Sequence, residues 1–168
     1  MRAPTVLVDR RSIDVMSEPE HVFAEIERLG GAAGWPAWDV LWRLRGHIDN
    51  WVGGPGVRRG RRDEEQLEVG DHLDFWRVEA LERPQLLRLR AEMRLPGKAW
   101  LQYEVQERAA GSRLVQSAMF DPDGIAGYAY WYLLLPVHLP IFRKMIGVLA
   151  KRAVRRGAAG TRPQPSGL

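Results

Sequence analysis

An uncharged stretch near the C-terminus constrains the fold more than any other feature of the sequence. Residues Ile125 to Phe142 contain no charged side chain, although 27% of the chain is charged. Such a segment must be covered by lipid, by a sheet of the same chain, or by a bound apolar ligand. Because it is too long and too rich in leucine for a strand, we predict a long C-terminal helix. Pro136 and Pro140 should disturb or break its first part, and an apolar stripe continues from there to Val154.

Polar and apolar residues alternate in the segments that precede this stretch. In Leu87 to Leu95 every second residue is apolar, and the residues between them are charged. Ala99 to Gln106 alternates again, Leu67 to Glu82 alternates around its centre, and Arg113 to Phe120 is predicted as a further strand. A period of two is typical of strands with one buried face. Because short turns join these segments, we predict an antiparallel meander with one solvent-exposed face.

The N-terminal part of the chain predicts a short strand and two helices. Arg11 to Met16 is predicted as the strand, and Pro19 to Leu29 as a helix with apolar residues at helical spacing. Ser17 is a suitable N-cap for this helix, and Glu20, three residues later, would complete a capping box. A second helix is predicted over residues 39–51, before a glycine-rich loop.

The predicted order is a strand, two helices, an antiparallel meander and a long apolar helix. The simplest packing lays the last helix across the concave face of the curved sheet, so that the two apolar surfaces cover each other. This α+β architecture is similar to the helix-grip fold of START-like lipid-transfer, plant-allergen-like and polyketide-cyclase-like proteins. We predict one such domain over residues 1–156, followed by a disordered tail over residues 157–168.

Several local strings resemble a bacterial domain family of unknown function in the SRPBCC/START-like superfamily. They are GWPAWDVLWRLRGHID, GDHLDFWRVE, LRLRAEMRLPGKAWLQYEV and FDPDGIAGYAYWYLLLPVH, and the resemblance covers about Gly34 to Ala150. In that family the domain often follows an NmrA-like, NAD(P)-binding short-chain reductase domain in the same polypeptide. These 168 residues contain no such nucleotide-binding domain, so the resemblance implies a separate NAD(P)-dependent reductase as a possible partner.

The net charge of +4 does not predict binding to nucleic acid. The segment from Lys151 to Leu168 holds five basic residues and no acidic one. The rest of the chain then contains 20 basic and 21 acidic residues, so the body of the domain is nearly neutral. The chain has no cysteine, which excludes disulfides and thiol chemistry. Charged residues occur too early and too often in its N-terminal segment for the apolar core of a signal peptide, and we expect a cytoplasmic protein.

Neither a metal site nor a cofactor is predicted. The four histidines are far apart in the sequence, and none has the H-x-x-x-H spacing of a zinc site. Gly54, Gly56 and Gly60 resemble a dinucleotide-binding loop, but such a loop follows a buried strand, and the segment before them is helix-like. The arginine-rich segment 58–62 is followed at once by three acidic residues, which opposes binding of phosphate or nucleic acid.

Asp74 and His138 are the candidates for acid or base catalysis, because both lie in apolar surroundings. Asp74 is flanked by apolar and aromatic residues in a predicted strand, and His138 lies between the two prolines. A carboxylate in an apolar pocket has a raised pKa and can exchange protons near neutral pH. Asp74 with Arg77, or Glu92 with Arg90, could equally form a structural ion pair on the outer face of the sheet.

Large rings gather on the predicted strands and on the last helix. For each single residue, plain core packing is the alternative, but together the rings favour a cavity that holds a flat or strongly apolar ligand. The predicted pocket residues are Trp76, Met93, Leu101, Tyr103, Tyr128, Tyr130, Trp131, Tyr132 and Phe142.

Three functions are compatible with this pattern. The first is a domain that binds a small hydrophobic molecule, such as a lipid, a polyketide or an isoprenoid-like metabolite, between sheet and helix. The second is a cyclase, hydratase or isomerase that uses Asp74 or His138 on the same fold. The third is a peripheral membrane protein that makes contact through Ile125 to Phe142, with the Arg/Lys tail as a surface anchor. We favour membrane association least, because prolines, tyrosines and His138 dilute that stretch as a membrane span and because the preceding meander needs a cover.

Overall fold

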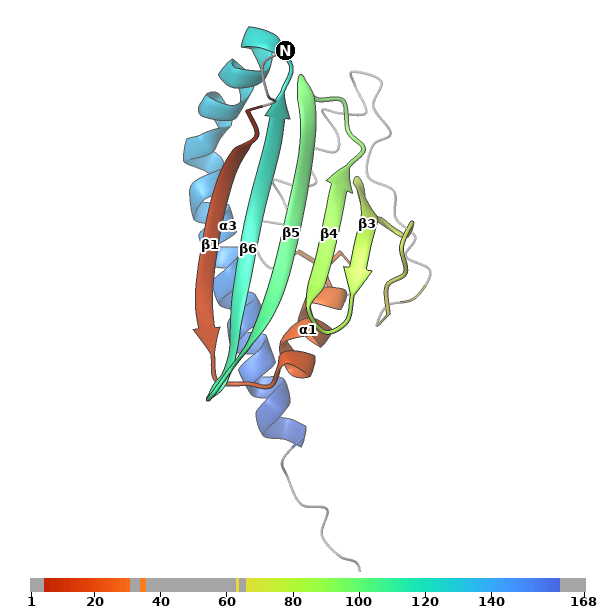
Figure 1. The fold of residues 1–168 in the computed structure, drawn as a ribbon, viewed down its shortest axis with the longest axis vertical. Helices are drawn as coiled ribbons and strands as arrows, with labels where there is room; N and C mark the ends of the chain where they lie inside the picture. The colour runs from red at the N-terminus through yellow and green to blue at the C-terminus, as the bar shows by residue number, and fades with distance from the viewer. Residues whose placement is uncertain (1–4, 31–33, 36–62, 64–65, 161–168) are drawn as a thin grey trace, which may run out of the picture.

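The computed structural model describes residues 5–30, 34–35, 63 and 66–160. In these residues, six strands form one antiparallel sheet in the order β1-β6-β5-β4-β3-β2, and two helices cover one of its faces (Figure 1). The strands are β1 Leu7–Val15, β2 His72–Leu73, β3 Trp76–Glu82, β4 Leu86–Ala91, β5 Gly97–Arg108 and β6 Gly111–Pro122. The helices are α1 Pro19–Glu27 and α3 Gly124–Gly160. The predicted α+β class and the predicted meander are therefore confirmed.

The first strand is longer than the sequence predicted. The strand expected at Arg11 to Met16 begins at Leu7, because β1 pairs with β6 along its whole length, from Leu7 opposite Phe120 to Val15 opposite Ser112. This pairing closes one edge of the meander with the N-terminal strand. It also places β1 and β6, which are far apart in sequence, side by side over α3 (Figure 1).

Helix α1 begins at Pro19, as predicted, but its N-cap lies one residue after the one that the sequence predicted. The N-cap residue is Glu18, and it makes no side-chain capping bond, so the predicted capping box of Ser17 and Glu20 is wrong. The Ser17 hydroxyl instead donates to the carbonyl oxygen of Ala153, 3.2 Å away. A tertiary hydrogen bond to α3 therefore replaces the expected local one.

The core lies between the inner face of the sheet, α1 and the C-terminal half of α3. Leu87 and Leu89 of β4 are fully buried, as the alternation in that segment predicted. Met145, Leu149 and Ala153 of α3 are also fully buried, which confirms the apolar stripe predicted for this half of the helix. Figure 1 shows α1 beside the same half, so apolar side chains of the sheet, α1 and α3 meet there.

Helix α3 is continuous, although we expected its first part to be disturbed or broken at the prolines. Each proline removes the hydrogen bond to the carbonyl group four residues earlier, which is the carbonyl of Tyr132 for Pro136 and of Pro136 for Pro140. These residues are exposed, so water can reach the carbonyl groups that lose their partners. The helix also runs beyond residue 157, where the tail was predicted to begin, and ends at Gly160.

Some predicted features lie outside the described residues. These are the helix at residues 39–51, the glycine-rich and arginine-rich segments 53–60 and 58–62, and the tail beyond Gly160.

Candidate functional site

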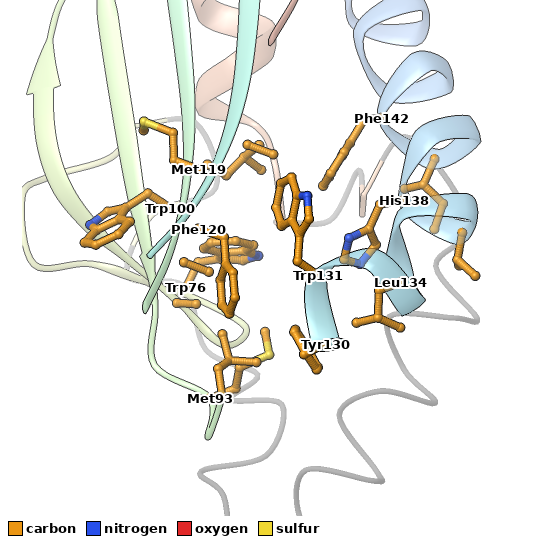
Figure 2. A pocket seen from close by; sticks show the side chains of 17 residues that line it. Trp76, Met93, Trp100, Met119, Phe120, Tyr130, Trp131, Leu134, His138 and Phe142 are labelled. Atoms are coloured by element: carbon orange, nitrogen blue, oxygen red, sulfur yellow. The ribbon is translucent and has the colours of Figure 1, made fainter. Parts of the chain in front are cut away.

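A cavity of about 260 Å³ lies between the sheet and the N-terminal half of α3. Strands β3 to β6 form its floor, and residues 130–142 of α3 form its roof. In Figure 2, Trp76 and Phe120 approach from the sheet, while Trp131 and His138 approach from the helix. Phe120 and Trp131 stack across this space with their ring planes within 10° of parallel and their centroids 5.9 Å apart.

The cavity exists because three neighbouring strands each present an alanine to this part of the inner face. Ala91 of β4, Ala99 of β5 and Ala118 of β6 all line it. Ala118 lies directly opposite Leu101, and Ala99 lies opposite Phe120. Where the same strands carry larger inward residues, such as Leu87 and Tyr103, no space remains and the side chains are fully buried. Our sequence reasoning missed these alanines, although their small size at inward positions was the available signal.

Six of the nine predicted pocket residues lie on the cavity wall, and three do not. Tyr128 and Tyr132 are separated by one helical turn and are 38% and 60% exposed, so they lie on the side of α3 that faces away from the sheet. Tyr103 is two residues beyond Leu101 on β5 and lies deeper in the core, with no exposed surface. The six residues on the wall are Trp76, Met93, Leu101, Tyr130, Trp131 and Phe142.

The wall of the cavity is almost entirely apolar. Among the lining residues that the structure describes, His138 is the only one whose side chain can carry a charge near neutral pH. Its imidazole packs on the ring of Phe142, with the two centroids 5.3 Å apart. No lysine, arginine, aspartate or glutamate of the described residues lines this space. The cavity therefore disfavours a ligand whose charged group would have to be buried in it.

The indole of Trp76 brings an unused hydrogen-bond donor to the cavity wall. Trp76 is 6% exposed, and within the described part of the chain its Nε1 atom is buried and has no partner. In Figure 2 this nitrogen lies on the side of Trp131 and α3. A buried N–H group without a partner lowers stability by about 1–3 kcal/mol, so an acceptor on a ligand or a water would be favourable here.

A second group of unpaired polar atoms lies in the core, beyond the cavity wall. Tyr103 and Gln116 face each other across β5 and β6, one inward pair beyond Leu101 and Ala118. The Tyr103 hydroxyl and the Gln116 Oε1 atom are buried and have no partner among the described residues. Burial raises the pKa of the Tyr103 phenol far above its usual value, so the hydroxyl stays protonated. The Gln116 amide donates to the carbonyl oxygen of Phe142, 3.3 Å away, which ties it to the cavity roof.

Asp74, the carboxylate predicted as a catalytic candidate, lies outside the cavity. It occupies the turn between β2 and β3 in a left-handed conformation with φ 56°, rather than the middle of one strand. Its carboxylate accepts a hydrogen bond of 2.6 Å from Trp35 Nε1. Arg77, which we considered as its ion-pair partner, instead donates to Glu92 at 2.6 Å. His138 is thus the one catalytic candidate that the structure places on the cavity wall.

No group of three histidine, aspartate or glutamate side chains that could hold a metal ion occurs in the described ranges of the chain. The surface of the cavity can therefore bind through apolar contact, ring stacking and a few neutral hydrogen bonds, and through the imidazole of His138.

Several solved structures are similar to this chain in architecture. The chain is similar to protein NE0264 from Nitrosomonas europaea, with 12% identity, a TM-score of 0.52, and coverage of 94% of this chain and 99% of that one. It is similar to the Zhui aromatase/cyclase from Streptomyces sp. R1128, with 16% identity, a TM-score of 0.53, and coverage of 94% and 99%.

A third similar structure is norcoclaurine synthase from Thalictrum flavum in complex with dopamine and hydroxybenzaldehyde. It has 10% identity, a TM-score of 0.54, and coverage of 95% of this chain and 90% of that one. At such low identity the likeness shows the fold alone, which is the helix-grip fold that the sequence predicted. No curated protein matches the sequence. One family does match, over residues 2–145, and the chain therefore belongs to the family described as "Protein of unknown function (DUF2867)".

Proposed function

We propose that this protein binds a small, uncharged and mostly apolar molecule in the cavity beneath α3. The observation that carries the proposal is the cavity itself, a space of about 260 Å³ with apolar walls between the sheet and α3. Small-molecule sites are typically concave, apolar and equipped with a few polar groups. This volume lies close to the lower end of the usual range, about 300–1,000 Å³, which favours a compact ligand over a long acyl chain.

The walls favour a flat ligand with one or two neutral polar groups. Trp76, Phe120 and Trp131 offer ring faces and edges for stacking. An oxygen of the ligand could accept from Trp76 Nε1, and a second neutral polar group could contact the imidazole of His138. A compact polyketide or isoprenoid-like metabolite has this chemistry. Norcoclaurine synthase, which has the same fold, has been solved with dopamine and hydroxybenzaldehyde, and this supports a site for small aromatic molecules.

The proposal is tested by filling the cavity. N-phenyl-1-naphthylamine is a neutral aromatic probe that becomes fluorescent in apolar surroundings. We expect the wild-type protein to bind it, and Ala118→Phe to weaken binding at least about tenfold, because the new ring occupies the space above Leu101. Ala158→Phe introduces the same ring at an exposed position and serves as the matched control. Equal binding by the wild type and Ala118→Phe would remove the cavity as the site.

A second candidate function is proton transfer to a bound molecule by His138. The observation that favours it is the position of this imidazole on the wall of an apolar cavity, where it could donate a proton to a bound molecule or accept one from it. A suitable probe is 2-tetralone, a small neutral ketone whose α-protons exchange with solvent. We expect the wild type to speed this exchange in D₂O and His138→Gln to abolish the effect while binding of the fluorescent probe stays. Exchange at the uncatalysed rate with the wild type would leave binding as the function.

A further inference from the structure

The half of α3 that covers the cavity has a second apolar side, which faces away from the sheet. Ile125 is 89% exposed, Leu133 is 78% exposed and Tyr132 is 60% exposed. Apolar residues of this size and number are uncommon on the surface of a protein that contacts only water. We call this surface the outer face of α3 and define it by the exposed residues Ile125, Ala129, Tyr132, Leu133, Pro136 and Leu139.

The outer face of α3 becomes basic at its C-terminal end. Arg143 follows Ile125 by 18 residues, which is five helical turns, so both lie on the same side of the helix. Arg143, Lys144 and Lys151 are exposed. No aspartate or glutamate occurs anywhere between Gly124 and Gly160. One side of a single helix is thus apolar over its first half and cationic over its second.

Helix α3 has the length and composition of a membrane span, but its packing does not suit one. Its most apolar window of 18 residues has a mean hydropathy of 1.5, and only 33% of that window is buried. Yet Trp131 and His138 line the cavity on the inner side, and Met145 and Leu149 are fixed in the core. A span would have to remove all of these contacts. A helix with one apolar side and basic residues beside it can instead lie in the plane of the interface.

We propose that the outer face of α3 docks on an anionic membrane surface. Ile125 and Leu133 would enter the boundary between head groups and acyl chains. Tyr132 would lie at head-group level, where amphipathic rings are enriched. Arg143 and Lys144 would contact lipid phosphates, each basic residue near such a surface adding about 1 kcal/mol to binding. The inner side of the same turns roofs the cavity, so docking brings the cavity beside the layer in which an apolar ligand dissolves.

The charge on α3 favours a lipid surface over a second copy of the chain. Two outer faces packed against each other would join two helices that carry basic residues and no acidic residue. Lipid phosphates supply the missing negative charge, and they do so without a fixed geometry.

Sedimentation with vesicles of equal parts phosphatidylglycerol and phosphatidylcholine tests the proposal. We expect the wild type to sediment with these vesicles, and the double variant Ile125→Glu/Leu133→Glu to lose affinity by at least about tenfold, because two carboxylates replace two inserting side chains. Arg143→Gln/Lys144→Gln should weaken binding to these vesicles more than binding to phosphatidylcholine alone. The matched control is Met16→Glu/Val69→Glu, which changes residues 73% and 64% exposed outside α3 and should bind as the wild type does.

Three results would overturn the proposal. The wild type could remain in the supernatant, or the Ile125→Glu/Leu133→Glu variant could bind as well as the wild type. Alternatively, light scattering could show a dimer that this variant dissociates, which would assign the outer face to a second copy. Binding of N-phenyl-1-naphthylamine is measured on the same variants. Ile125 and Leu133 face away from the cavity, so loss of docking with retained probe binding separates the membrane proposal from the ligand proposal.

Discussion

The two halves of α3 belong to one continuous helix but have opposite surroundings. In the C-terminal half, Met145, Leu149 and Ala153 have no exposed surface. In the N-terminal half, Ile125 and Leu133 are almost fully exposed, although the sequence there is the more apolar of the two. Apolar composition therefore does not decide which half joins the core. The elements that pack beneath each half decide whether that half joins the core.

The C-terminal half packs against α1, whose Val22, Phe23 and Ile26 are fully or almost fully buried. Figure 1 shows that α1 lies beside this half only. The N-terminal half instead faces the part of the sheet that carries alanines 91, 99 and 118. The side chains below this half are small, and among the described residues no second helix lies alongside it. This leaves a cavity on one side of α3 and an exposed apolar face on the other. One half of the helix thus holds the fold together, and the other is available for binding.

The largest expected effect comes from truncating the same residue type in the two halves. We expect Leu149→Ala to lower the free energy of unfolding by about 2–5 kcal/mol, because it removes a fully buried side chain and leaves a void. Leu133→Ala should change it by less than about 0.5 kcal/mol, because that side chain is 78% exposed. Urea unfolding followed by circular dichroism measures both. Equal losses for the two variants would refute the division of α3 into a core half and a binding half.

The second prediction concerns the ion pair that ties the C-terminal half of α3 to α1. Arg156 Nε donates to Glu25 Oε1 at 2.7 Å, and the Glu25 side chain is only 8% exposed. We expect Arg156→Met to lower the free energy of unfolding by about 1–3 kcal/mol, because the buried Glu25 carboxylate loses its hydrogen bond and keeps the longer ion pair with Arg28, at 3.9 Å. Arg155→Met, at the exposed neighbouring position, is the control. If both variants unfold at the same urea concentration as the wild type, the contact does not fix this half of the helix.

The third prediction concerns the boundary between the cavity and the core. The Tyr103 hydroxyl is buried and has no partner among the described residues. We expect Tyr103→Phe to raise the free energy of unfolding of the empty protein by about 1 kcal/mol, because an unsatisfied polar group is removed from the interior. Tyr132→Phe, at a residue that is 60% exposed, should have no effect. A loss of stability in Tyr103→Phe would show that the hydroxyl has a partner in the folded protein.

The sequence predicted the sheet well because alternation is a property of local backbone geometry. Leu87 and Leu89 are buried and Arg88 and Arg90 are not, as a period of two requires. No comparable local pattern exists in the first half of α3. An apolar helix without a polar side carries no mark of which side faces the sheet, so Tyr128 and Tyr132 were assigned to the pocket although they face outward.

Other features of the site depend on residues that are distant in the sequence. Asp74 was placed in a strand, but it lies in a turn and is held by Trp35, 39 residues earlier. Ser17 was expected to cap α1, but it bonds to Ala153 at the other end of the chain. The cavity depends on alanines that three strands bring together. No local pattern contains these pairings, because they form only when the sheet closes over α3.

The smallest expected effect belongs to an exposed ion pair, which sets a reference for the pair between Glu25 and Arg156. Asp14 of β1 lies opposite Arg113 of β6, and the Arg113 guanidinium donates to its carboxylate at 2.7 Å and 3.0 Å. These hydrogen bonds, together with the positive charge of Arg113, hold the pKa of Asp14 below its usual value of 3.8. We expect Arg113→Gln to raise the pKa of Asp14 toward that value.

A carboxyl whose pKa is lower in the folded state than in the unfolded state adds stability above its unfolded pKa. This stability is lost as the pH falls through the folded pKa. The difference in unfolding free energy between the wild type and Arg113→Gln should therefore be small at neutral pH, because the pair is exposed, and should shrink further in acid. NMR titration of the Asp14 carboxyl carbon measures the pKa directly. An unchanged pKa in Arg113→Gln would contradict the assignment. A stability loss as large as that of Arg156→Met would show that the buried pair under α3 holds the helix no better than an ion pair exposed to water.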